Sequence, residues 1–334
     1  MISLATKYRP SKLEDVVGQS VTVDILRYQI EKEILAGALG FFGASGCGKT
    51  TIARIVSNMI NDNKGHPIEI DAASNNSVDD VRNIIEGASQ RSLDSKYKVY
   101  IIDECHAISS QGWQAFLKLL EEPNKYTKFI FCTTNPEKIP DTVISRLQTF
   151  TFTKISDEQI VDRLRYICRA EELELDDNSL KFITRISNGS MRQSIANLEK
   201  CTKTSKIVSY EEVVKIAGSS NYDLMIELFK AIYNKNDKIA VSIVENVYKS
   251  GKDLKLFIFE FLKFILDLSK AKIFENNLSI TSLPDTQQIR ELFAFSSKFN
   301  EILENVVEFY ESIRQSNEIR FMFESKLILW CAQN

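Results

Sequence analysis

Residues Ala38–Ile55 read ALGFFGASGCGKTTIARI, in which an apolar run is followed by a glycine-rich turn and then by a helix-like segment. The turn completes the pattern G-x-x-x-x-G-K-[ST] with Gly43, Gly46, Gly48, Lys49 and Thr50. Glycines let the backbone bend so that successive amide N–H groups point at one phosphate, and the following helix adds its positive end. The stretch predicts a phosphate-binding loop between a strand and a helix; a glycine-rich turn without a ligand is the alternative.

The side chains after the last glycine indicate what the loop binds. Lys49 can reach the outer phosphates of a nucleotide as a point charge, and the Thr50 hydroxyl is placed to bind the Mg²⁺ that bridges them. We expect nucleotide contacts along the whole loop, from Gly43, Ala44, Ser45, Gly46, Cys47, Gly48, Lys49, Thr50 and Thr51.

Composition limits the class of protein. The 334 residues are enough for two or three domains, and 44% hydrophobic with 26% charged residues is typical of a soluble globular chain. A net charge of −3 argues against a surface that binds nucleic acid all over, although it leaves room for a local basic patch.

Cysteine usage and the N-terminus indicate a cellular compartment. The six cysteines form no C-x-x-C pair and only two histidines accompany them, which predicts reduced intracellular thiols and no zinc site. The first residues, MISLATKYRP, lack an apolar signal segment, and no segment of membrane-spanning length is free of charge. We expect a cytoplasmic protein with no membrane partner.

An acidic pair follows a second strand-like run. KVYII at Lys98–Ile102 ends in Asp103-Glu104, and the carboxyl ends of buried parallel strands are where such sheets place their chemistry. We expect Asp103 to hold Mg²⁺ through its water shell and Glu104 to orient and deprotonate an attacking water. Capping of the next helix is the alternative, and the phosphate loop upstream favours the nucleotide interpretation.

Two further stretches are candidates for contacting a nucleotide. KFIFC at Lys128–Cys132 leads into Thr133-Thr134-Asn135, which can hydrogen-bond a γ-phosphate or the attacking water, or form only a turn. KYRPSKLEDVVGQ at Lys7–Gln19 has little periodicity and contains a proline that forbids a regular helix, so a strap is expected. Its apolar residues Tyr8, Val16 and Val17 form a slot for a base or belong to the core.

Strands alternate with helices from Gly40 to Thr153, which predicts an α/β fold with a parallel sheet and its functional loops on one edge. After the first run, strands are expected at Ile68–Ile70, Lys98–Ile102, Lys128–Cys132 and Thr149–Thr153. Helices are expected at Val21–Ile34, at Thr51–Asn61, from Asp79 onward and at Ser110–Glu122.

The remainder of the chain reads as helical. Helix starts are expected at Ser156, Asp177, Gly189-Ser190 and Tyr210, and a linker at Gly218-Ser219-Ser220. Arg192, at the head of the third of these helices, is by spacing alone an ordinary solvated cation.

Beyond Asn221 we expect four or five long helices. Leu254–Phe274 is apolar apart from one polar stripe of Glu260, Lys263, Asp267 and Lys270. Apolar residues from Ile289 to Ile313 predict one further helix. The wide apolar faces suit packing against sister subunits or a self-contained bundle.

Taken together, the motifs resemble those of the AAA+ ATPases and, within them, the clamp-loader ATPases related to the gamma and tau subunits of bacterial DNA polymerase III. The likeness covers about residues 4–200 and is carried by KYRPSKLEDVVGQ, GASGCGKTTIARI, IEIDAASNNSVDDVR, KVYIIDECH, LKLLEEP, TTNPEKIPDTVISR and GSMRQS. It implies an ATP hydrolase with ATP and Mg²⁺ as cofactors.

The resemblance also implies roles for individual residues. Catalytic residues would be Lys49, Asp103, Glu104, Thr134, Arg146 and Arg192, and Mg²⁺ would be held by Thr50 and Asp103. Nucleotide contacts outside the loop would come from Tyr8, Arg9, Pro10, Val16, Val17 and Arg192. Thr134 and Arg192 would be sensors of the γ-phosphate, and Arg146 would reach into the ATP site of the adjacent subunit, which makes hydrolysis depend on assembly. Arg82 and Lys118 would touch DNA phosphates in a central channel.

The implied architecture has three domains: an AAA+ nucleotide-binding domain at 1–155, a helical lid at 156–218 and a helical collar at 219–334 that assembles a ring, a pentamer in similar loaders. The implied partners are other clamp-loader subunits, a sliding clamp and primer-template DNA. A AAA+ helicase or branch-migration motor is the alternative function. A third alternative is a subunit that binds nucleotide only to stabilise the assembly and does not hydrolyse it. The intact Lys49, Glu104 and Arg146 argue against this alternative.

Three features depart from the bacterial pattern. A four-cysteine zinc module is replaced by the short stretch Asn61–Pro67, which again predicts no zinc. Leu147 stands where the motif has cysteine, and Gln193 stands where an acidic residue usually follows the second-sensor arginine. The sequence also lacks the long C-terminal tail of the longer bacterial form. We expect a phage-encoded or otherwise divergent loader to show such a difference.

Overall fold

The computed structural model describes residues 2–122, 124–217, 222–313, 316 and 318–332. The chain divides into two compact units, one made of Met1–Glu174 with Ser187–Ile207 and the other of Leu175–Ile186 with Val208–Asn334. The expected linker Gly218-Ser219-Ser220 lies outside the described residues.

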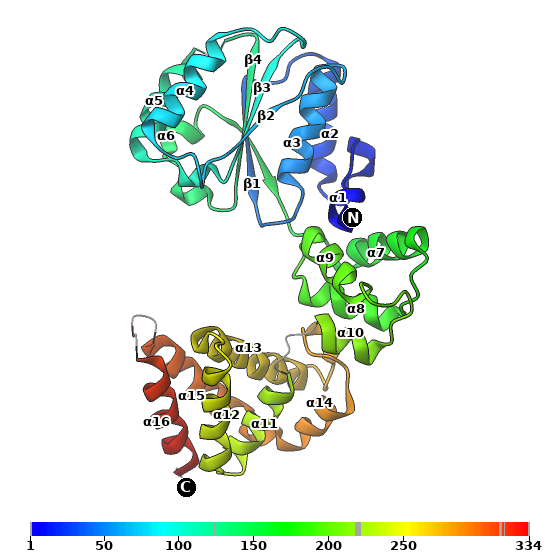
Figure 1. The fold of residues 1–334 in the computed structure, drawn as a ribbon, viewed down its shortest axis with the longest axis vertical. Coiled ribbons are helices and arrows are strands. Elements are labelled where there is room, and N and C mark those ends of the chain that lie inside the picture. Colours follow the sequence, from blue (N-terminus) through cyan, green and yellow to red (C-terminus); the bar gives the residue numbers. More distant parts are fainter. Residues whose placement is uncertain (1, 123, 218–221, 314–315, 317, 333–334) are drawn as a thin grey trace. The chain divides into compact units, whose positions relative to one another are not determined.

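A parallel sheet of five strands forms the centre of the first unit, as predicted (Figure 1). The strands are β1 (Ala38–Gly43), β2 (Ile68–Asp71), β3 (Lys98–Asp103), β4 (Thr127–Thr133) and β5 (Gln148–Phe152). Their order is β2-β3-β4-β1-β5, so β4 lies between the strand that precedes the glycine-rich loop and the strand that ends in the acidic pair.

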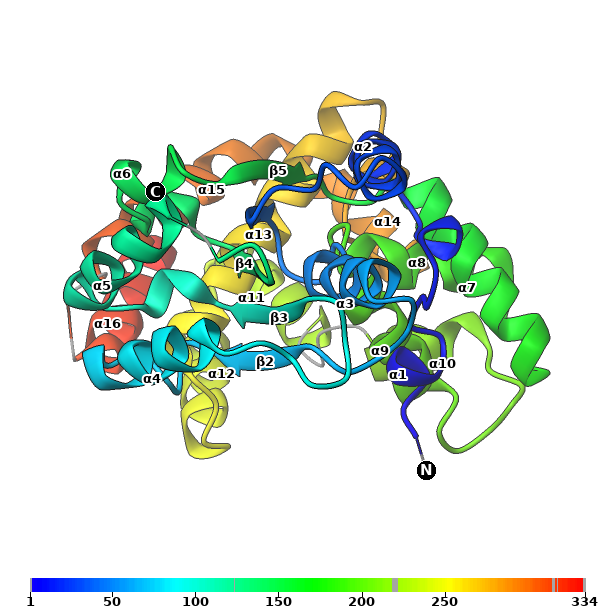
Figure 2. The ribbon, with the colours of Figure 1, turned by 90° about the horizontal axis from the view of Figure 1, so that it is seen from above.

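Both faces of the sheet are covered, and alternate residues of the inner strands β1, β3 and β4 serve two separate cores. Val99 and Ile101 of β3 pack under α2 (Ser20–Glu31) and α3 (Lys49–Ile60). Tyr100 and Ile102 pack on the other face. That face is covered by α4 (Val78–Ser89), α5 (Ser110–Glu121) and α6 (Asp141–Ile144), opposite α2 and α3 in Figures 1 and 2.

The rest of the first unit consists of short elements and two helices from the region expected to be a lid. These are α1 (Leu4–Lys7), η1 (Leu13–Asp15), η2 (Cys105–Ala107), η3 (Pro136–Lys138), α7 (Asp157–Glu171) and α9 (Met191–Cys201). The expected strap at 7–19 contains only the end of α1 and the single turn η1.

The second unit is helical in the described residues. It contains α8 (Asp177–Ile186), α10 (Tyr210–Ala217), α11 (Tyr222–Tyr233), α12 (Asp237–Lys249), α13 (Leu254–Ile273), η4 (Leu278–Ile280), α14 (Gln287–Leu292), η5 (Phe293–Lys298), α15 (Phe299–Ser312) and α16 (Ile319–Ala332). Fully buried phenylalanines, among them Phe229, Phe261 and Phe323, fill the core of α11 to α16. The predicted lid is shared between the two units, and the three-domain division stays a prediction.

One predicted helix is wrong. Residues 289–313 do not form a single helix, because the tight turns of η5 separate α14 from α15. In η5 the Phe295 ring lies 4.6 Å from the Tyr233 ring, and two serines follow, which compete for backbone hydrogen bonds. Apolar spacing alone does not reveal such a break.

The polar stripe predicted on α13 is wrong at Asp267. This side chain is only 6% exposed, whereas Lys263 and Lys270 on the same helix are exposed. Asp267 Oδ2 accepts hydrogen bonds from the Ser282 backbone N–H at 3.1 Å and from the Ser282 hydroxyl at 2.7 Å. None of the helices in the described ranges is both long enough and apolar enough to cross a membrane.

We expect Asp267→Ala to lower the thermal unfolding temperature of the full chain by roughly 2–10 °C, because it leaves two donors of Ser282 without their acceptor. Circular dichroism at rising temperature measures the change. Lys263→Ala, on the exposed side of the same helix, is the matched control and should leave the temperature within about 2 °C. Equal effects of the two substitutions would contradict the structural role of Asp267.

Candidate functional site

The glycine-rich loop has the predicted strand-turn-helix arrangement, since β1 ends at Gly43 and α3 begins at Lys49. Gly43, Gly46 and Gly48 have φ values of 150°, 74° and 109°, which side chains rarely adopt. A Cβ at Gly43 would lie 2.1 Å from the Phe152 carbonyl oxygen, and one at Gly46 would lie 2.0 Å from Ser190 Oγ. The loop therefore needs glycine at these positions for both backbone conformation and space.

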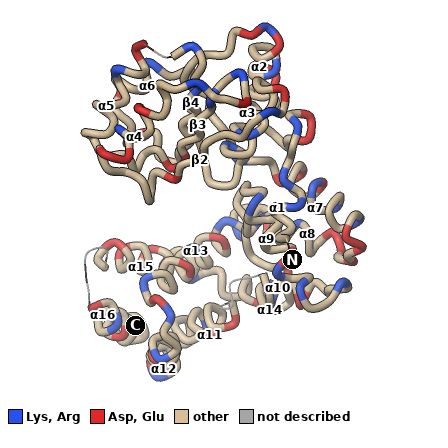
Figure 3. The backbone as a smooth tube through the Cα atoms, turned by 45° about the horizontal axis from the view of Figure 1, so that its top comes forward, with Lys and Arg blue, Asp and Glu red and all other residues tan. Residues whose placement is uncertain are grey.

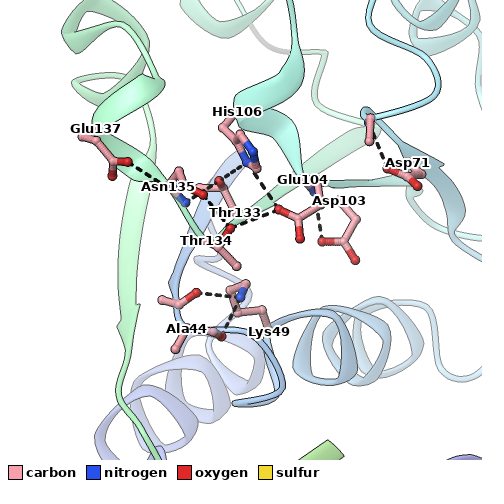
Figure 4. A network of polar contacts seen from close by, with 12 residues as sticks. Ala44, Lys49, Asp71, Asp103, Glu104, His106, Thr133, Thr134, Asn135 and Glu137 are labelled. Atoms are coloured by element: carbon pink, nitrogen blue, oxygen red, sulfur yellow. Dashed lines mark hydrogen bonds and ion pairs between the residues drawn. The ribbon is translucent and has the colours of Figure 1, made fainter. Parts of the chain in front are cut away.

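The Lys49 ammonium is buried inside this loop, with only 7% of the residue exposed (Figure 4). Its Nζ donates to the carbonyl oxygens of Gly43 at 2.7 Å and Ala44 at 2.9 Å. A buried charge must be paired or hydrogen-bonded, so these carbonyls hold a positive charge in the position where an anion can bind. Burial raises the pKa of the neighbouring Cys47 thiol, whose Sγ donates to the Ala44 carbonyl oxygen at 2.8 Å.

The loop is joined to the acidic pair at the end of β3. Thr50 Oγ1 donates to Asp103 Oδ2 at 2.8 Å, so a hydroxyl and a carboxylate lie side by side. Oxygen ligands of this kind, few in number, suit Mg²⁺, which keeps several waters and is completed by substrate phosphates. The donor set fits the ion expected from the sequence.

Side chains from the end of β4 lie next to Glu104 because β4 and β3 are neighbours in the sheet. Thr134 Oγ1 lies 3.4 Å from Glu104 Oε2 and donates to Asn135 Oδ1 at 2.8 Å. On the same side, His106 Nδ1 lies 3.3 Å from Glu104 Oε2 and 2.9 Å from Thr133 Oγ1 (Figure 4). His106 is not among the site residues expected from the sequence.

A cavity of about 470 Å³ opens beside these groups. Among the residues expected to contact a nucleotide or to act in catalysis, those that line it are Arg9, Pro10, Val16, Val17, Ser45, Gly46, Cys47, Gly48, Lys49, Thr50, Thr51, Asp103, Glu104 and Arg192. The structure thus brings together the strap, the loop, the acidic pair and the head of α9. Gly43, Ala44, Tyr8, Thr134 and Arg146 are not among the lining residues.

Tyr8 is directed to α7 instead of to the cavity. Its hydroxyl donates to the Glu171 carboxylate, and its ring meets that of Tyr166 edge-on at 6.1 Å. Burial and the hydrogen bond to Glu171 raise the pKa of Tyr8 to about 12, so the hydroxyl keeps its proton. The position of Tyr8 does not support the expected contact with a base, because the residue ties the strap to α7.

Two arginines come to the cavity from the helical region. Arg192, one residue after the start of α9, lines the cavity, and the Met191 N–H donates to the Gly46 carbonyl oxygen at 3.2 Å. The position of Arg192 favours a ligand-binding role over that of an ordinary surface cation. Arg163 of α7 also lines the cavity and donates from Nη2 to the Tyr8 carbonyl oxygen at 2.9 Å. Nothing in the sequence distinguishes Arg163 from any other helical arginine.

The remaining predicted residues lie elsewhere on the first unit. Arg146 donates from Nη2 to Glu121 Oε1 at 2.6 Å and from Nη1 to the Thr142 carbonyl oxygen at 2.5 Å. Arg82 on α4 and Lys118 on α5 are exposed on adjacent helices, where basic and acidic residues are interspersed (Figure 3).

No group of three or more His, Cys, Asp or Glu side chains in the described ranges is arranged to hold a metal ion. All six cysteines are buried and unpaired.

Two families match parts of the chain. Residues 66–156 match the family described as DNA polymerase III, delta subunit, and residues 208–302 match DNA polymerase III subunits gamma and tau domain III.

Similar proteins extend the match over most of the chain. It is 31% identical to DNA polymerase III subunit tau of Bacillus subtilis, over 97% of this chain and 62% of that protein. It is 30% identical to the gamma subunit of Buchnera aphidicola from Acyrthosiphon pisum, over 81% of each chain. The chain spans 52–62% of the length of the tau subunit of B. subtilis and the gamma/tau subunit of Mycoplasma genitalium.

Among solved structures, the Thermotoga maritima RuvB Holliday junction branch migration motor superposes with a TM-score of 0.53 at 16% identity, over 67% of this chain and 79% of that one. The likeness shows the fold, which is that of the AAA+ P-loop proteins.

We expect Lys49→Ala to weaken the binding of ATP with Mg²⁺ roughly tenfold to hundredfold, because it removes a charged donor buried in the loop. Titration with a fluorescent ATP analogue measures the affinity. Lys64→Ala removes a charge at an exposed position after α3 and should leave the affinity unchanged. Undiminished binding by Lys49→Ala would place the phosphates elsewhere.

Proposed function

Because the chain belongs to the family of the DNA polymerase III gamma and tau subunits, we propose that it is an ATP-hydrolysing subunit of a sliding-clamp loader. In this proposal it assembles into a ring with other loader subunits, opens a sliding clamp in the ATP-bound state and grips primer-template DNA. Hydrolysis of ATP then releases the closed clamp on the DNA.

The observation that carries the proposal is the convergence of two strand ends and one helix start on one cavity. The loop after β1 supplies Lys49, the end of β3 supplies Asp103 and Glu104, and α9 adds Arg192. A buried cation, a hydroxyl-carboxylate pair and a second carboxylate are the groups that water attack on a γ-phosphate requires. No other arrangement of polar groups described above has this composition.

In the proposed reaction Lys49 exchanges the carbonyls of Gly43 and Ala44 for the outer phosphate oxygens of ATP. Glu104 orients the attacking water and accepts its proton. Thr134, beside Glu104, donates to the γ-phosphate or the water. Thr50 and Asp103 would hold Mg²⁺, which would neutralise negative charge on the phosphates when bound.

The other end of the nucleotide is proposed to lie against the strap. Val16, Val17 and Pro10 offer apolar surface for a base, and Arg9 and Arg163 are cations in the same wall. Cavities that are mostly apolar with a few placed polar groups are typical of small-ligand sites. Arg192 acts from the same chain as a sensor of the γ-phosphate.

Arg146 is proposed to act on the ATP site of a neighbouring subunit. The residue does not line the cavity of its own chain, and its side chain is 34% exposed. An arginine supplied in this way raises hydrolysis strongly only after assembly. We propose that the helical collar at 219–334 assembles the ring and that 156–218 acts as the lid over the nucleotide-binding domain at 1–155.

A branch-migration motor is the competing function, since the solved RuvB structure is named for that activity. The likeness to RuvB is 16% in identity, against 30% for the gamma subunit named above. The match of residues 208–302 to gamma and tau domain III also favours the loader.

We expect the wild-type ring, purified through a tag on this chain, to hydrolyse ATP fastest with clamp and primer-template DNA together and to unwind no duplex. Glu104→Gln should bind the fluorescent ATP analogue normally but lose at least ~100-fold in hydrolysis. Arg146→Ala should lose a similar factor in the ring only. Steady-state phosphate release measures the rates. Strand separation, or stimulation by DNA alone, would support the motor instead.

We expect Arg82→Ala and Lys118→Ala each to weaken primer-template binding by the ring to the same degree for every DNA sequence. Each should also reduce the slope of log affinity against log salt by about 1, because each removes one phosphate contact. Fluorescence anisotropy at several salt concentrations measures both. Lys32→Ala, at the end of α2 on the opposite side of the sheet, is the control and should change neither.

A further inference from the structure

The Glu104 carboxylate has two side-chain neighbours from different elements. The Thr134 hydroxyl lies 3.4 Å from Glu104 Oε2, but it has a single proton and lies closer, at 2.8 Å, to Asn135 Oδ1. That proton is therefore directed to Asn135. His106 Nδ1 lies 2.9 Å from Thr133 Oγ1 and 3.3 Å from Glu104 Oε2, so a proton on Nδ1 would be bonded to Thr133 and would also bring positive charge close to the carboxylate.

The tautomer of His106 follows from the atoms around Nδ1. A carboxylate serving as a base only accepts hydrogen bonds, so an unprotonated nitrogen at 3.3 Å would face it lone pair to lone pair. A proton on Nδ1 makes the contact with Glu104 favourable, and we assign this tautomer. Its second neighbour, Thr133 Oγ1 at 2.9 Å, also accepts the Asn135 backbone N–H at 3.0 Å, and its two lone pairs suffice for both donors.

The backbone holds His106 rigidly in this place. Glu104 adopts a left-handed conformation with φ 47°, which turns the chain directly after β3. The turn η2 follows, in which the Ala107 N–H donates to the Glu104 carbonyl oxygen at 2.9 Å, and the fully buried Cys105 anchors it. Only 20% of the His106 side chain is exposed, and η2 packs against β4.

We propose that His106 is the positioning residue for the base Glu104. Its Nδ1–H, bonded to Thr133 Oγ1, attracts Oε2 toward β4 by electrostatic contact, so that Oε1 is the oxygen presented to the attacking water. Glu104 lines the cavity and His106 does not, so the imidazole acts through the carboxylate and not on the nucleotide. The inference rests on the proposed ATP hydrolysis and deepens it. In Figure 4 the contact from His106 meets Glu104 on the side of Thr133 and Thr134.

The test compares three histidine variants in the ring purified through a tag on the full chain. Single-turnover hydrolysis gives the rate of the chemical step, and titration with the fluorescent ATP analogue gives the affinity. His106→Ala should slow the chemical step roughly tenfold to hundredfold with an unchanged affinity, since removal of a partner that orients a functional group has effects of this size. His66→Ala, at the exposed position of the other histidine, should change neither quantity.

His106→Asn is the variant that separates positioning from packing. The Asn amide nitrogen can occupy the place of Nδ1 and donate to Glu104, although the side chain is smaller than imidazole. We expect it to recover the hydrolysis rate to within about threefold of wild type. An unimpaired rate in His106→Ala overturns the inference, and so does an equal loss in both His106 variants, which would indicate a packing role.

The outcomes also separate this inference from the proposed function. A wild-type ring that binds ATP but does not hydrolyse it with clamp and DNA overturns both. A wild-type ring that hydrolyses ATP, loses hydrolysis with Glu104→Gln and keeps it with His106→Ala overturns only the role of His106. Weaker nucleotide binding by His106→Ala would likewise overturn it, because a group acting through Glu104 leaves ground-state binding unchanged.

Discussion

The buried charge of Lys49 is the constraint on which the rest of the site depends. Only 7% of Lys49 is exposed, so its ammonium group must be met by oxygen atoms, and the bend of the loop turns the carbonyls of Gly43 and Ala44 toward it. That bend requires positive φ at three glycines, and the first of them also lies against the Phe152 carbonyl of β5. The edge strand β5 thus fixes the position of the loop. The loop in turn fixes the position of the Lys49 ammonium, whose charge a triphosphate would neutralise.

The order of the strands determines which groups meet that charge. Because β4 lies between β1 and β3, the residues after β4 lie beside the acidic pair after β3, and Thr134 comes within hydrogen-bond reach of Glu104. Local patterns predict the four later strands to within one residue at each end, since a buried parallel strand is a short apolar run with polar residues after it. They do not predict the order, which depends on pairings between distant segments. The same limit applies to the break at η5 and to Asp267, whose partner Ser282 lies on a later loop.

The residues of the site also fall into two groups, those recognisable from local sequence and those positioned by contacts between distant segments. The glycine-rich loop and Asp103-Glu104 are each contiguous motifs, so their chemistry can be predicted from the sequence. The structure places both around one cavity. His106 and Arg163 acquire their positions from contacts across the fold, with Thr133 in one case and the Tyr8 carbonyl in the other. Tyr8, Val16 and Val17 before the phosphate loop suggested either a base-binding slot or part of the core, but the Glu171 carboxylate on α7 offers the Tyr8 hydroxyl a charged acceptor. The hydrogen bond from the Tyr8 hydroxyl to a carboxylate determines the orientation of the ring more strongly than the apolar character of the ring does.

The contact between Arg146 and Glu121 bears on how the proposed ring would complete each site. A pair exposed at 34% and 52% contributes about 0–1 kcal/mol, because water and salt screen it. A neighbour's triphosphate carries more negative charge than one carboxylate and would lie in a cavity that excludes part of the water, where the same guanidinium interacts more strongly. Loss of the Glu121 contact would therefore cost the single chain little free energy. The new contact between Arg146 and a neighbour's phosphate would stabilise the assembly by more. In the single chain the guanidinium is held by Glu121 and by the Thr142 carbonyl oxygen, and both contacts are local to the first unit.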